Sequence, residues 1–190
     1  MDKFINKISL DDTIKILTIT LAFLGLLKAL FEYTKAQKWK KAEFLAKEMK
    51  EFFADVDVKN ATLMLDWNEI EIHTNCDQHF LFTDNLLKEA LKHHKERTFP
   101  GELATVRQIF DNFLFKLGMF QSYIESNLVS KKDLEPYLKY WIEIIADPQK
   151  MRKNDEDIKQ LWKFINNYEY EAIVKLFKNF GYNIELVKEY

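Results

Sequence analysis

The feature that most constrains this chain is a long apolar run near its beginning, over residues 14–33. Its central part, residues 16–27, carries no charge, and the extension to residue 33 adds only Lys28 and Glu32. A helix that spans a bilayer needs about 20 residues. Lys28 lies near the end of the run, where its long side chain can reach the lipid headgroups. The run therefore predicts a transmembrane helix over residues 13–34, after an N-terminal tail over residues 1–12.

The apolar run has two other interpretations, a helix of a soluble protein and a cleaved signal peptide. Twelve uncharged residues are fewer than a spanning helix needs, so a buried or self-associating helix of a soluble protein stays open. A cleaved signal peptide is disfavoured, because lysines follow the run where a small-residue cleavage site would be expected.

A lysine cluster directly after the run predicts the orientation of the chain. The cluster and its tryptophan are Lys35, Lys38, Trp39, Lys40 and Lys41, whereas the lysines before the run are accompanied by three aspartates. Positive charge concentrates on the cytoplasmic side of a membrane helix. The single cysteine also suits a reducing compartment. We therefore predict a single-pass protein of the inner membrane with a cytoplasmic domain over residues 35–190, whose cluster contacts the lipid bilayer. An ordinary solvated helix turn is the alternative reading of the cluster.

Small residues follow one face of the predicted membrane helix. They are Thr18, Ala22, Gly25 and Ala29, spaced by four, three and four residues. Small faces let membrane helices approach closely. This pattern predicts a homo-oligomer, and it leaves an oligomeric membrane-disrupting effector open as a function.

The fold class predicted for the chain is mainly α, an N-terminal transmembrane helix followed by an α-helical domain with one small β-hairpin. Only four glycines and three prolines interrupt 190 residues, and apolar residues recur at helical spacing. Residues 69–74 alternate apolar and polar, and residues 79–83 are rich in strand formers, which predicts the hairpin. Helices are expected over residues 39–53, 57–67, 84–93, 102–128, 155–165 and 169–180, the last ended by Gly181 as a C-terminal cap. A further helix carries residues 137–145, with Pro136 in its first turn after a capping box of Ser130 and Asp133.

The longest expected helix of the domain, residues 102–128, carries an apolar stripe. Its members are Leu103, Val106, Phe110, Phe113, Leu117, Phe120 and Ile124. Steps of three and four residues place them on one face, which predicts burial in the core. A ligand pocket lined by the phenylalanines is the alternative, although no polar residues converge on it in the sequence.

Five segments together resemble a family of uncharacterised bacterial membrane-anchored proteins, similar to the domain of unknown function DUF4760. The segments are WKKAEFLAKEMKEFF (39–53), LMLDW (63–67), IFDNF (109–113), YLKYW (137–141) and LFKNFGY (176–182). The resemblance covers nearly the whole chain, and it implies one spanning helix before a helical domain of this size, with no activity. Val56 departs from the family pattern, which would place a proline between the two acidic residues there.

One set of residues could bind a metal ion. His73, Cys76 and His79 have the spacing His-x2-Cys-x2-His, and His93 and His94 follow one helix later. These residue types ligate zinc, and a tight hairpin turn would bring the first three together. The sequence therefore offers a zinc site formed by His73, Cys76, His79 and His93, and no other cofactor is expected. The alternative is a polar loop with exposed histidines.

Signatures of most function classes are missing from the sequence. It has no glycine-rich phosphate loop, no G-x-S-x-G and no H-E-x-x-H, and its aspartates at 66, 111 and 147 form no recognisable pair. Its 28 basic and 30 acidic residues disfavour nucleic-acid binding. The favoured function is a membrane-anchored cytoplasmic module that binds an unidentified cytoplasmic protein or senses a signal. A metal-dependent hydrolase and a membrane-disrupting effector are the alternatives, and the sequence favours a protein that is not an enzyme.

Overall fold

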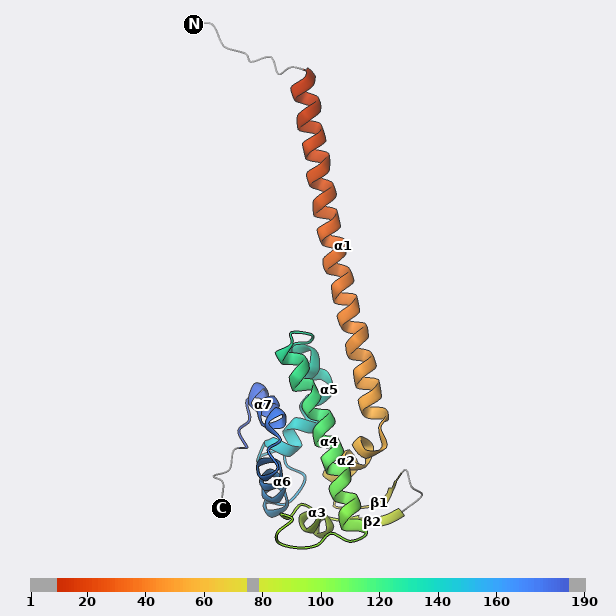
Figure 1. Ribbon diagram of the computed structural model, residues 1–190, viewed down its shortest axis with the longest axis vertical. Coiled ribbons are helices and arrows are strands. Elements are labelled where there is room, and N and C mark those ends of the chain that lie inside the picture. The colour runs from red at the N-terminus through yellow and green to blue at the C-terminus, as the bar shows by residue number, and fades with distance from the viewer. Residues whose placement is uncertain (1–9, 75–78, 185–190) are drawn as a thin grey trace. The chain divides into compact units, whose positions relative to one another are not determined.

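A computed structural model describes residues 10–74 and 79–184 of the chain. Within these residues the fold is mainly helical, with one two-stranded antiparallel sheet, which confirms the predicted fold class (Figure 1). In chain order the elements are α1 (Leu10–Ala54), α2 (Val56–Asp66), β1 (Glu69–His73), β2 (His79–Thr83), α3 (Asp84–Ala90), α4 (Glu102–Glu125), α5 (Lys131–Ala146), α6 (Asp155–Asn167) and α7 (Glu171–Phe180). The chain divides into two compact units, Met1–Phe44 and Leu45–Tyr190, and we call the second the helical domain.

Helix α1 contains the whole apolar run. It begins at Leu10, three residues before the predicted membrane segment, and continues without a break through the lysine cluster to Ala54. Asp11 and Asp12 lie in its first turn, where negative charge interacts favourably with the helix dipole. By length and composition α1 could cross a membrane, and none of the residues in its most apolar window is buried. The hydroxyl of Thr18 donates to the Ile14 carbonyl, 2.9 Å away, so this polar side chain is satisfied within the helix.

The start of α2 shows why Val56 does not need to be a proline. Asp55 is the N-cap, and its Oδ1 accepts hydrogen bonds from the backbone N–H groups of Asp57 and Val58, both at 3.1 Å. A side-chain cap of this kind satisfies the free donors of a helix start on its own. The second acidic residue, Asp57, accepts from Asn112 of α4 at 2.6 Å.

The hairpin has the predicted position and pairs in register from Glu69 opposite Thr83 to His73 opposite His79. Alternate side chains on one face, Ile72, Phe80 and Phe82, are buried. The period of two along a strand explains why the residues between them, Glu71 and the apolar Leu81, stay exposed.

Helix α4 forms the centre of the helical domain and packs against α2, α3 and α7. The predicted stripe is confirmed in its middle, where five members are almost fully buried, and its two end members are half-buried. Ile109 and Leu114, which lie outside the stripe, are also buried. Because neighbours cover α4 from several sides, its buried surface is wider than a single stripe.

Local signals set several other helix ends. Asp133 accepts a hydrogen bond from the backbone N–H of Ser130 at 2.7 Å, and Asn154 caps α6 through the N–H groups of Glu156 and Asp157. Gly181 ends α7 with φ 94°, a left-handed conformation that glycine adopts at little cost. Two predicted ends were three residues too late: α3 stops at Ala90 rather than near His93, and α4 stops at Glu125 rather than at Leu128.

Candidate functional site

The structure divides the predicted zinc ligands that it describes between two places, the hairpin and the segment after α3. His73 and His79 face each other across the hairpin with ring centroids 6.2 Å apart, and both are exposed. Cys76 lies outside the described residues. His93 and His94 follow α3, and their rings contact Tyr168 instead of the hairpin histidines. Among the residues that the structure describes, no three His, Cys, Asp or Glu side chains form a group that could hold a metal ion.

Zinc binding therefore stays a prediction that depends on Cys76. Metal analysis of the purified chain decides it: zinc in stoichiometric amount that is lost in His73→Ala and in Cys76→Ala would support the site. A folded chain free of metal would exclude it.

His93, the predicted fourth zinc ligand, and its neighbour His94 contact Tyr168. The backbone N–H of His94 donates to the Tyr168 hydroxyl at 3.0 Å, and the His94 Nδ1 lies 2.9 Å from the same oxygen. The His93 ring stacks on the Tyr168 ring with centroids 5.6 Å apart. Partial desolvation and the neighbouring His94 lower the pKa of His93, which favours the neutral imidazole. These contacts attach the segment after α3 to the end of α6.

Arg107 on α4 is the centre of this attachment. Its guanidinium carbon lies over three aromatic rings, those of Phe99, Phe164 and Tyr168, at 4.7, 4.8 and 4.6 Å from their centroids. The same guanidinium donates to the backbone carbonyls of Ala90 and Lys92, at 3.1 and 2.9 Å. The last carbonyls of a helix lack partners within the helix, so Arg107 supplies partners at and just beyond the end of α3.

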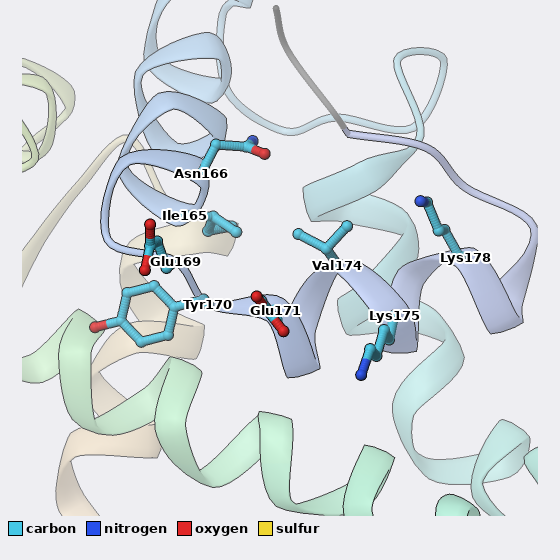
Figure 2. A pocket seen from close by; sticks show the side chains of 8 residues that line it. All are labelled: Ile165, Asn166, Glu169, Tyr170, Glu171, Val174, Lys175 and Lys178. Atoms are coloured by element: carbon cyan, nitrogen blue, oxygen red, sulfur yellow. The ribbon is translucent and has the colours of Figure 1, made fainter. Parts of the chain in front are cut away.

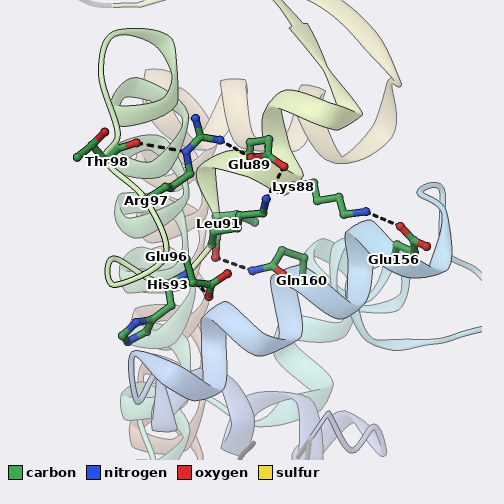
Figure 3. A network of polar contacts seen from close by, with 10 residues as sticks. Lys88, Glu89, Leu91, His93, Glu96, Arg97, Thr98, Glu156 and Gln160 are labelled. Carbon is green, nitrogen blue, oxygen red and sulfur yellow. Dashed lines mark hydrogen bonds and ion pairs between the residues drawn. The ribbon is translucent and has the colours of Figure 1, made fainter. Parts of the chain in front are cut away.

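Further polar contacts hold the segment after α3, as Figure 3 shows. Gln160 of α6 donates to the Leu91 carbonyl at 2.8 Å, and Arg97 forms an ion pair with Glu89. Glu96 accepts from the backbone N–H of His93 at 3.1 Å. The segment is thus bound to α3 through Arg97 and to α6 through Gln160, and these contacts are structural, because each group already has a protein partner.

A second polar cluster surrounds Lys153, which precedes α6. The Lys153 side chain is 1% exposed, and its ammonium forms an ion pair with Asp84 at 2.6 Å. It also donates to the Trp67 carbonyl and lies 5.3 Å from the centre of the Phe82 ring. Burial lowers the pKa of Lys153, and the Asp84 carboxylate opposes that change. A lysine so completely covered cannot reach a dissolved substrate, so we interpret the pair as a structural link between the α5–α6 connection and the start of α3.

The other charged groups of this cluster are also paired within the protein. Asp157 is buried, and desolvation followed by repulsion from Asp84 raises its pKa, while Asn154 donates to it at 2.6 Å. Asp66 accepts from the Tyr140 hydroxyl at 2.5 Å and lies 3.5 Å from the Arg152 guanidinium.

Among the described residues, the three aspartates noted in the sequence contact different groups and not one another. Asp66 binds Tyr140, as described, and Asp111 accepts from the Tyr170 hydroxyl at 2.5 Å. Burial, and then this hydrogen bond, raise the pKa of Tyr170. Asp147 accepts from the backbone N–H of Gln149 at 3.0 Å. Each carboxylate thus has a separate structural partner.

Three surface hollows lie around α4 and α7. One, drawn in Figure 2, has a volume of about 320 Å³ and is formed by the end of α6, the turn that follows and one side of α7. It lies beside the last described residues, since Asn166 donates to the Ile184 carbonyl at 2.9 Å. The other two flank α4: an α4–α7 hollow of about 430 Å³ and an α1–α4 hollow of about 160 Å³.

Between the two hollows of α4 lie two exposed apolar side chains, Phe115 and Met119, which we call the α4 ridge. Phe115 is 68% exposed and Met119 is 40% exposed. Met119 lines both hollows. The ridge is the strongest candidate for a binding surface on the helical domain.

The predicted membrane residues lie on α1. Lys35, Lys38, Trp39 and Lys40 are exposed, and Lys41 is partly covered. The small-residue face of Thr18, Ala22, Gly25 and Ala29 is exposed along its length. A side chain at Gly25 would meet no atom within 4 Å.

Sequence reasoning missed the α4 ridge, Arg107 and Lys153. The ridge had a weak signal, because positions 115 and 119 lie outside the predicted stripe while still being apolar. Arg107 and Lys153 had none, since their partners come from distant parts of the chain.

Comparison of the chain with protein-family models, curated proteins and solved structures gives no match. The resemblance to DUF4760-like proteins therefore stays a prediction.

Proposed function

We propose that this protein is a single-pass protein of the inner membrane whose cytoplasmic helical domain binds another protein. One observation carries the anchoring part: none of the side chains in the most apolar window of α1 is buried. Apolar side chains gain free energy when an apolar environment covers them.

The energetic argument follows from the size of the exposed surface. Large apolar side chains from Ile14 to Phe31 are each about half exposed or more, and they occur on every side of the helix. Covering such a side chain is worth about 1.5–3 kcal/mol. A helix of 20 residues is about 30 Å long, which matches the hydrocarbon thickness of a bilayer. A bilayer would cover all sides of the helix at once.

The orientation is supported by the lysines after the run, which would remain at the cytoplasmic surface. Trp39, at 70% exposed, has the amphipathic character of residues at membrane interfaces. Lysines there would gain about 1 kcal/mol each from anionic lipid.

Membrane fractionation with an alkaline carbonate wash tests the anchor. We expect the full chain to stay in the washed membranes and a chain that begins at Ala36 to be released. The variant Leu21→Lys/Leu24→Lys should also be released, because a lysine at the centre of a spanning helix costs about 2.5–3.5 kcal/mol.

The matched control is Ala42→Lys/Ala46→Lys, which adds the same two lysines to exposed positions of α1 beyond the run. This control should stay in the membranes. Release of the full chain by carbonate would contradict the anchor and would make α1 an assembly helix. Protease added to spheroplasts, which should leave the helical domain intact, tests the orientation.

The membrane-disrupting alternative differs in one result. A membrane-disrupting effector should be toxic when overexpressed, and the toxicity should disappear in Gly25→Leu. An interaction module requires no such toxicity.

A further inference from the structure

The α4 ridge differs from the other large apolar side chains of its helix. Phe110, Phe113 and Phe120 are at most 2% exposed, whereas Phe115 is 68% exposed. Phe115 and Met119 are four residues apart, so their side chains adjoin on one face of the helix. Exposed apolar side chains that adjoin each other, beside a groove, mark interaction surfaces more often than isolated ones do.

The hollows on both sides give the ridge a shape that can receive a partner. Gly118 is one of the residues that line the α4–α7 hollow of about 430 Å³. An added Cβ at Gly118 would come within 3.2 Å of the Ala172 side chain, so the two helices approach closely at this point. On the other side, Phe52, Phe120 and Tyr123 help to line the α1–α4 hollow.

The charge of the lining is predominantly negative. The glutamates that line the two hollows are Glu48, Glu51, Glu125, Glu169 and Glu171. Two lysines also line them, and both have acidic partners: Lys116 with Asp55, and Lys175 with Glu125 at 3.6 Å. Burial and the hydrogen bond to Glu48 raise the pKa of Tyr123 to about 12, so this side chain is uncharged near neutral pH.

We infer that the α4 ridge and its two hollows bind a basic amphipathic helix of a partner protein. Apolar side chains of that helix, three and four residues apart, contact Phe115 and Met119, and its lysines or arginines face the glutamates. A second copy of this chain would place the same glutamates opposite each other, which disfavours a symmetric contact. An anionic lipid surface would be repelled for the same reason. The inference rests on the proposed function and names the chemistry of the partner.

Peptide binding to the full chain tests the inference. The chain is placed in nanodiscs of zwitterionic phosphatidylcholine, and empty discs give the background. The probe is a fluorescein-labelled synthetic helix of leucine and lysine at amphipathic spacing, and the matched probe has glutamate in place of lysine. We expect saturable binding of the lysine peptide, which weakens with added salt, and at least tenfold weaker binding of the glutamate peptide.

Variants of exposed residues identify the surface without disturbing the core. Phe115→Ala/Met119→Ala should raise the Kd of the lysine peptide about tenfold. The control Leu128→Ala, which shortens another side chain that is 50% exposed, should leave the Kd unchanged. Glu51→Gln/Glu171→Gln should weaken binding, whereas Glu102→Gln at the start of α4 should not.

Three outcomes would overturn the inference: equal binding of both peptides, no binding above that of empty discs, or an equal loss of binding in Leu128→Ala. A change of oligomeric state in the ridge variants would also overturn it, because a second copy would then cover the ridge. The carbonate wash is independent of these measurements, so a chain that stays in the membrane but binds no peptide refutes this inference alone.

Discussion

Replacing Arg107 by alanine is expected to lower the free energy of unfolding of the helical domain by about 3 kcal/mol. The variant removes hydrogen bonds to the carbonyls of Ala90 and Lys92 and three contacts with aromatic rings. The carbonyls would then lose their charged donor at the end of α3. Denaturant unfolding of the full chain in detergent, followed by tryptophan fluorescence, measures the loss.

Two further variants identify the cause of this loss. Arg107→Lys keeps the positive charge but not the planar fork of donors, so we expect an intermediate loss. Arg152→Ala removes an arginine whose side chain is 54% exposed, and it should cost less than about 1 kcal/mol. If Arg107→Ala proved as stable as the unchanged protein, the attachment of the segment after α3 would not depend on this side chain.

Replacing Lys153 by alanine is expected to cost about 3 kcal/mol, because removal of one partner of a buried ion pair leaves the other charge uncompensated. Asp84 would keep its carboxylate near Asp157, whose pKa is raised by burial and then by repulsion from Asp84. The Trp67 carbonyl would also lose its charged donor.

A double-mutant cycle separates the ion pair from simple packing. Lys153→Met preserves most of the side-chain volume, and we expect it to be less damaging when combined with Asp84→Asn than when made alone. Additive effects of the two substitutions would contradict a coupling between Lys153 and Asp84.

The same lysine predicts a specific dependence of stability on pH. Its pKa in the folded protein lies below the ordinary value of 10.5, because burial disfavours the charged ammonium. Between these two values the unfolded chain binds more protons, so this group makes the free energy of unfolding rise as the pH increases. We therefore expect the stability of the unchanged protein, relative to Lys153→Met, to increase as the pH approaches 10.5. A difference in the free energy of unfolding that stays constant over that pH range would show that burial does not lower the pKa of Lys153.

Much of the fold was predictable from the sequence, because its signals are local. Alternating residues predicted the hairpin at the position where the structure has it. Gly181 predicted the end of α7, since the left-handed conformation there depends on that residue alone. The end of α3 was predicted too late, because Arg107 and Gln160, from α4 and α6, bind the carbonyls around that end.

The candidate sites show the limit of such signals. The histidine spacing predicted one zinc cluster, but the described histidines divide into a hairpin pair and a pair that contacts Tyr168. Which side chains meet across the fold depends on how the helices pack, and sequence spacing carries no information about that packing.

The sequence by itself determined the helical class, the hairpin and the apolar run of α1, because periodicity, composition and turn residues act over a few neighbouring positions. Only the tertiary structure decided that Arg107 binds the end of α3, that Lys153 is buried against Asp84, and that Phe115 and Met119 remain uncovered on α4. Apolar residues occur around much of α4, so the sequence could not distinguish the buried from the exposed ones. That distinction depends on where α2, α3 and α7 cover the helix, which is a property of their packing and not of any one segment.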